Sequence, residues 1–141
     1  MNSKIIQEKF QELMFYTLAH DDQVYFIHQH VVDAYPLQTA NDDIKPITFT
    51  YCLIGLYLYL KQGYTGRQVQ LAHMKLAKKK VVLKPAGLPQ HRGDISVIDV
   101  LAALPGAARD QKINEWCASV WNAYETYHEA IARYAQEQLG V

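Results

Sequence analysis

The sequence predicts an all-α protein: a single-domain helical bundle of five to six helices with a long C-terminal helix, covering residues 1–141. Apolar residues recur at steps of three and four along most of the chain, which is the spacing of an amphipathic helix. Short capping and turn signals separate these stretches. With 141 residues, half hydrophobic and a fifth charged, the chain has the size and composition of one globular domain.

The N-terminal part contains two predicted helices. The first covers residues 3–19, with Ser3 as its N-cap. The second covers residues 23–35, and we expect Pro36 to end it because a proline disfavours helical backbone in the residue before it. The face predicted to be buried in this second helix carries Val24, His28, Val31 and Tyr35.

A third helix, residues 47–61, is apolar on nearly every side and should be the most buried element. Gly55 in its middle costs about 1 kcal/mol of helix propensity against Ala, which a close helix crossing would justify. Gly63 is placed to end the helix as a C-cap. We expect this helix and the last one to form the central pair of the bundle.

Two capping boxes predict the next helices. Thr65 with Gln68 opens a helix over residues 66–80, and Ser96 with Asp99 opens a short one that reaches residue 103. The final helix, residues 107–139, would be about 45–50 Å long at 1.5 Å per residue. Because this exceeds the width of a small domain, we expect the helix either to kink or to protrude into a partner.

Composition argues against several classes of function. Fourteen basic residues balance fourteen acidic ones, so no overall field attracts nucleic acid or an anionic membrane, and the basic stretch 75–84 is interpreted as a solvated face. The longest apolar run, residues 49–60, is shorter than a membrane span. We expect no signal peptide and a cytoplasmic location, with Cys52 and Cys117 as reduced, buried thiols.

The histidines are the main candidates for a site. His28 lies on the predicted buried face, so its imidazole needs a hydrogen-bond partner or a ligand. His30 and Asp33 have the i,i+3 spacing that can hold a metal ion, but a solvated surface hydrogen bond between them is the simpler interpretation. We expect His20 and His91 to be solvated in turns, and His73 to be partly buried.

Trp121, Tyr124 and His128 form an edge of the last helix whose aromatic rings carry polar tips. One interpretation is a well-packed helix seam. The alternative is one wall of a pocket shared with His28, Tyr35 and Cys52. If a divalent metal is bound, His28 and His128 are its first candidates, although two histidines need a third ligand.

Several short motifs resemble those of an uncharacterised bacterial family, a domain of unknown function. They span most of the chain from His28 onward: residues 28–35 with Gln38, residues 53–56, residues 97–100, and finally Trp116, Trp121 and His128. The resemblance implies a His-Pro pair after Gln38 and a histidine before Leu53. This chain has Thr39-Ala40 and Cys52 instead, so a site that used those histidines would be lost or altered here.

Two functions from different classes follow from these observations. The first is a small-ligand or metal site inside the bundle, lined by the candidates His28, Asp33, Tyr35, Cys52, Trp121, Tyr124 and His128. The second is a non-enzymatic interaction protein that forms a homodimer through its C-terminal helix. Neither pattern specifies a reaction, a cofactor or a substrate, and a comparison with metal-dependent helical enzymes would rest on fold alone.

Overall fold

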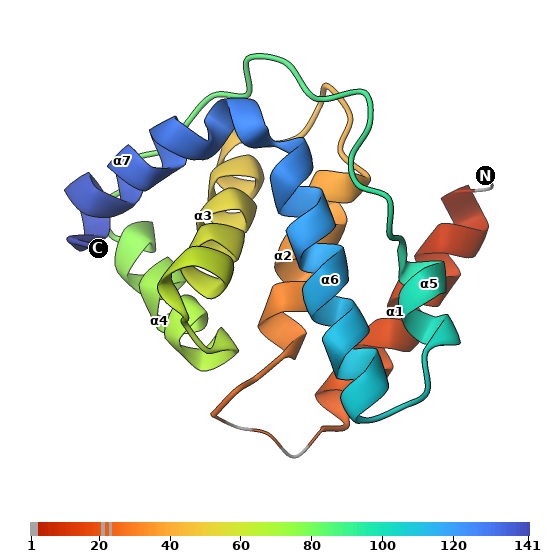
Figure 1. Cartoon of the computed structure of the whole chain (residues 1–141). Helices are drawn as coiled ribbons and strands as arrows, with labels where there is room; N and C mark the ends of the chain where they lie inside the picture. Colours follow the sequence, from red (N-terminus) through yellow and green to blue (C-terminus); the bar gives the residue numbers. More distant parts are fainter. Residues whose placement is uncertain (1–2, 21, 23) are drawn as a thin grey trace.

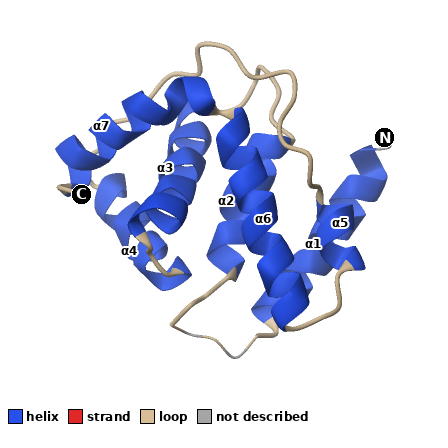
Figure 2. Cartoon of the chain, in the orientation of Figure 1, coloured by secondary structure: helices blue, strands red, loops and turns tan. Residues whose placement is uncertain are grey.

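The computed structural model describes residues 3–20, 22 and 24–141 (Figure 1). All regular secondary structure in these residues is helical, as Figure 2 shows, and the all-α class is confirmed. The described elements are α1 (Ser3–Leu18), α2 (His28–Gln38), α3 (Pro46–Gln62), α4 (Gly66–Ala77), α5 (Val97–Ala102), α6 (Ala107–Ala123), the 3₁₀-helix η1 (Glu125–Tyr127) and α7 (His128–Leu139).

Helix α2 is at the centre of the bundle. It packs most extensively against α3 and also contacts α6, α1 and α4, while α1 and α5 lie on one side and α4 and α7 on the other (Figure 1). The prediction that α3 and the last helix form the central pair is therefore wrong in one respect. Helix α2 has the larger contact with α3, where Gly55 of α3 leaves space for the Asp33 side chain of α2.

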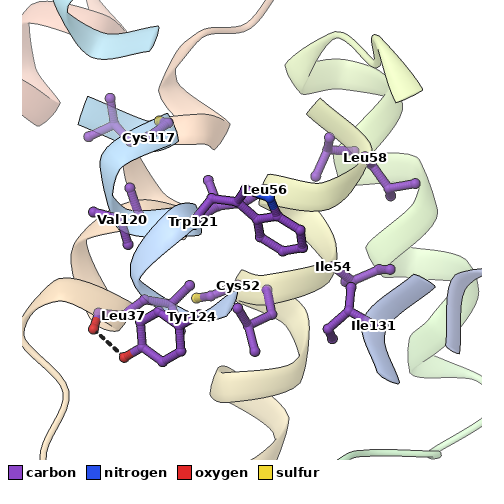
Figure 3. Close-up of a cluster of buried hydrophobic side chains, with 14 of the residues drawn as sticks. Leu37, Cys52, Ile54, Leu56, Leu58, Cys117, Val120, Trp121, Tyr124 and Ile131 are labelled. Atoms are coloured by element: carbon purple, nitrogen blue, oxygen red, sulfur yellow. Dashed lines mark hydrogen bonds between the residues drawn. The ribbon is translucent and has the colours of Figure 1, made fainter. Parts of the chain in front are cut away.

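The core is built on α3, which buries eight of its residues. Leu53 and Leu56 are both fully buried. Figure 3 shows this cluster, in which the Tyr124 hydroxyl donates a hydrogen bond to the Leu37 carbonyl at 2.5 Å. Cys52 and Cys117 are buried free thiols, as predicted.

The boundaries of α2 differ from the prediction. The helix begins at His28 and runs through Pro36 to Gln38. Pro36 lies in the last turn and cannot donate to the carbonyl four residues before it, yet the helix continues past it and the Thr39 N–H bonds to the Tyr35 carbonyl. The predicted buried face therefore shifts: Val24 precedes the helix and is 69 % exposed, whereas His30, Asp33 and Leu37 are buried.

The predicted C-terminal helix of residues 107–139 is two helices. Helix α6 ends at Ala123, η1 follows, and α7 leaves in a new direction across α3 and α4 (Figure 1). Tyr127 and Tyr134 bond through their hydroxyls to backbone atoms of residues 81–87. Because the chain bends at η1, neither helix is longer than the domain is wide. The helix length is therefore no longer an argument for a dimer.

Three of the local signals for helix ends are confirmed, whereas Pro36 does not end α2 and Ser3 is the first residue of α1 and not its N-cap. Both hydrogen bonds of each capping box, Thr65–Gln68 and Ser96–Asp99, are present. Gly63 ends α3 in the left-handed conformation, with φ of 71°. Among the described residues, no helix is long and apolar enough to cross a membrane.

Because α3 supports the whole core, we predict that Leu53→Ala and Leu56→Ala each lower the free energy of unfolding by about 2–5 kcal/mol. The matched control is Ile47→Ala, since Ile47 lies in the first turn of the same helix and is 50 % exposed. Urea denaturation measures all three. Losses below about 1 kcal/mol at both leucines would contradict a central α3.

Candidate functional site

A pocket of about 470 Å³ opens at the end of the bundle where α2 begins. This volume is within the range of ligand-binding pockets. The wall is assembled from the loop before α2, the start of α2, the end of α3, the turn into α4 and the start of α6. The described residues that line it are His20, Asp22, Tyr25, Ile27, His30, Tyr59, Gly63, Tyr64, Thr65 and Asp110.

His30 is the most unusual residue of this wall. Only 3 % of it is exposed, and its ring stacks on Tyr59 with centroids 3.5 Å apart. Its Nδ1 is buried and has no hydrogen-bond partner in the described part of the chain. Burial lowers the pKa of His30 to about 3, so the imidazole is neutral near pH 7 and offers one donor and one acceptor.

Tyr59 is held beside His30 by Asn114. The Nδ2 of Asn114 donates to the Tyr59 hydroxyl oxygen at 2.8 Å. Burial raises the pKa of Tyr59 to about 12, so the phenol keeps its proton. Since the oxygen already accepts from Asn114, the O–H remains available as a donor at the pocket wall.

A hydrogen-bonded network at the rim joins α1 to α6. Asp110 Oδ1 accepts from the Tyr16 hydroxyl at 3.0 Å and lies 3.3 Å from Nε2 of His20. The other ring nitrogen of His20 lies 3.1 Å from the Tyr16 carbonyl oxygen. His20 is therefore not the free turn residue that we predicted, because both of its nitrogens face acceptors.

The loop before α2 forms one wall of the pocket and packs on the start of α4. The Gly66 N–H donates to the Tyr25 carbonyl at 2.6 Å, and the guanidinium of Arg67 lies over the Phe26 ring. A Cβ on Gly66 would lie 1.8 Å from the Phe26 carbonyl oxygen. This close approach requires glycine at the first position of α4.

Asp33 lies one turn beyond His30 on α2, at the crossing with α3. The position of a Cβ on Gly55 would be 2.0 Å from Asp33 Oδ2, so the missing side chain provides the space for the carboxyl group. This confirms the close crossing expected at Gly55. Gln29 donates to Oδ1, but Oδ2 has no partner in the described part of the chain.

The prediction that His30 and Asp33 form a solvated surface hydrogen bond is wrong. Both side chains are buried, and each retains one unpartnered polar atom among the described residues. Burial raises the pKa of Asp33 well above its usual range, although the Gln29 amide opposes the shift. Burial thus favours the neutral carboxylic acid form of Asp33 over the charged carboxylate.

The histidines proposed to share one pocket are not brought together. His28 begins α2 and lies 2.9 Å, through Nδ1, from the Thr17 hydroxyl. His128 begins α7, stacks on Trp121, and lies 2.8 Å, through Nε2, from the Trp121 carbonyl. These two helices begin at opposite ends of the bundle (Figure 1), so the residues are separately satisfied histidines.

The remaining candidates also pack outside this pocket. Tyr35 stacks on Phe10 with centroids 3.6 Å apart, and Tyr124 bonds to Leu37. Cys52 is buried in the core, and its burial raises the pKa of the thiol well above the usual value. These contacts are those of a well-packed interior.

The pocket residues that sequence analysis missed come from five separate segments. His20 and Asp110 are 90 positions apart, and no local pattern relates them. One signal was available for His30: Val31, Ala34 and Leu37 continue the apolar spacing beyond Pro36 and put His30 on their side of the helix.

No group of three or more histidine, cysteine, aspartate or glutamate side chains is placed to hold a metal ion among the described residues. At the pocket, His20 and Asp110 bind each other, and the ring of His30 stacks on Tyr59. The arrangement instead combines aromatic surface with a few fixed polar atoms, which is the pattern of a small-molecule site.

Comparison with known proteins identifies one family. The model of a family of unknown function, DUF5946, matches residues 7–125. This range contains every described residue of the pocket wall. No curated protein and no solved structure matches the chain.

Asp33→Asn is predicted to change how stability depends on pH. Because the folded-state pKa of Asp33 is raised, its stabilising contribution is complete below the unfolded-state pKa, near 4, and is lost as pH rises through the folded-state pKa. The loss approaches about 1.4 kcal/mol per pH unit. Asparagine fills the same space without titrating.

Urea denaturation of wild type and Asp33→Asn between pH 5 and 8 measures this effect. His30, whose pKa is lowered to about 3, acts in the opposite sense below pH 6.5 in both proteins and cancels in the difference. The variant should gain stability relative to wild type as pH rises. A difference that stays constant across this range would show that Asp33 is ionised in the folded protein.

Proposed function

The chain belongs to the DUF5946 family, and we propose that it is a small-molecule-binding domain whose site is the pocket between α2, α3, α4 and α6. The main support for the proposal is that His30 Nδ1 is buried without a hydrogen-bond partner among the described residues. A buried nitrogen without a partner costs free energy, and here the residue that bears it forms part of a pocket wall. No described protein group bonds to either nitrogen of this ring, so a ligand that reaches the ring from the pocket would give the imidazole its first hydrogen-bond partner.

The surroundings of His30 support the same proposal. Tyr59 presents a hydroxyl whose oxygen is already bonded to Asn114, and Tyr25, Tyr64 and Ile27 add apolar surface to the wall. In small-molecule sites a few fixed polar atoms orient the ligand. The aromatic lining covers most of the ligand surface that is buried. Two packed helices and a hydrogen-bonded rim hold these groups in place before a ligand arrives.

The other candidate residues give weaker support for a ligand site. The edge formed by Trp121, Tyr124 and His128 packs inside the core. His128 and His28 each have a protein partner. Trp121 Nε1 is also buried without a partner among the described residues, but Trp121 does not line this pocket, whereas His30 does.

Three single-ring probes test the proposal: 4-tert-butylphenol, benzyl alcohol and benzamide. At least one should bind and shift the NMR signals of the His30 ring. In His30→Phe, which keeps the ring stack on Tyr59 but removes both nitrogens, binding should weaken by about three- to tenfold, the value of one hydrogen bond.

His91→Gln is the matched control, because His91 is an exposed histidine outside the pocket that pairs with Asp94. It should leave binding unchanged. Equal urea midpoints for the variants exclude unfolding as the cause. If no probe shifts the His30 signals, or if His91→Gln weakens binding as much as His30→Phe, the proposal is wrong.

A further inference from the structure

We propose that this pocket selects a small organic cation, such as an amine or a quaternary ammonium group; the inference rests on the proposed function. It follows from the combination of aromatic rings, carboxylates and an uncharged imidazole on one wall.

The aromatic part of the wall suits a cation. Tyr25, Tyr59 and Tyr64 line the pocket together with the His30 ring. The face of an aromatic ring carries partial negative charge and attracts ammonium groups within about 6 Å. A tyrosine-lined pocket can therefore bind a cation whose surface is largely apolar.

The charged residues of the wall also favour a cation. Asp22 and Asp110 line the pocket, while no lysine or arginine is among the described lining residues. His30 adds no positive charge near neutral pH, because burial lowers its pKa to about 3. Asp110 is already bonded to His20 and to the Tyr16 hydroxyl, so Asp22 is the lining carboxylate without a side-chain partner among the described residues.

Helices α2 and α4 begin beside the pocket, and helix N-termini in general attract anions. Their donors are already in use. The Thr65 hydroxyl caps α4 by accepting from the Gln68 N–H, and Asp22 Oδ2 accepts from the Ile27 N–H at the start of α2. An anion would have to approach the Asp22 carboxylate while these N–H groups are bonded within the chain, so a cation is favoured.

Two probes of matching shape separate charge from size. In 4-hydroxyphenyltrimethylammonium and 4-tert-butylphenol, the same ring and hydroxyl carry either a cationic nitrogen or a neutral carbon with three methyl groups. Isothermal titration calorimetry on the full chain should give about tenfold tighter binding of the cation, consistent with a desolvated cation–aromatic contact.

Variants assign the preference to the pocket. Asp22→Asn keeps an oxygen for the Ile27 N–H but removes the charge, so it should weaken binding of the cation by several-fold and leave the neutral probe unchanged. Asp94→Asn is the matched control, because Asp94 is an exposed carboxylate bonded to His91 outside the pocket.

The outcomes distinguish the two proposals. Equal affinity for both probes, reduced for both by His30→Phe, would overturn the cation preference and leave the binding function intact. Binding of neither probe would overturn the cation preference, and it would overturn the binding function as well if benzyl alcohol and benzamide also fail to bind. A cation preference that survives Asp22→Asn, or that Asp94→Asn reduces equally, would place the interaction elsewhere and contradict the assignment.

Discussion

The structure depends on the contact between Asp33 and Gly55 at the crossing of α2 and α3. The carboxyl group occupies the space where a side chain on α3 would otherwise be, so the two helices approach closely. This is the most extensive helix pair of the bundle, and α6 packs against both members. Accepting a buried acid at this point requires that Asp33 be neutral, since an isolated buried carboxylate would cost far more than a hydrogen bond returns.

The same crossing determines where His30 lies. His30 is one turn before Asp33 on α2, so the position of that helix puts the imidazole against Tyr59 of α3. The Cys117 thiol contacts the His30 backbone carbonyl at 3.6 Å from the α6 side. The imidazole is therefore fixed by stacking on α3 while its backbone is contacted from α6, and it keeps a nitrogen that the described protein does not satisfy. Preorganised polar groups of this kind reduce the entropy that ligand binding must overcome.

Local chemistry made much of the fold predictable. The capping boxes at Thr65 and Ser96 and the C-cap at Gly63 involve residues a few positions apart, and all three are present. The register of α2 depends on tertiary packing that overrides the proline rule at Pro36. The break at Tyr124 has no glycine or proline to mark it. The pocket joins segments as far apart as His20 and Asp110, so its composition required the structure.

A double-mutant cycle between Gly55 and Asp33 tests the crossing most directly. Without a close contact, Gly55→Ala should stabilise α3 by up to about 1 kcal/mol, because alanine is the better helix former. With the contact, the added methyl group meets the Asp33 carboxyl, and we predict a loss of about 1–3 kcal/mol in the free energy of unfolding. In an Asp33→Ala background, most of that loss should disappear. Additive effects, or a stabilising Gly55→Ala in the wild-type background, would contradict the account.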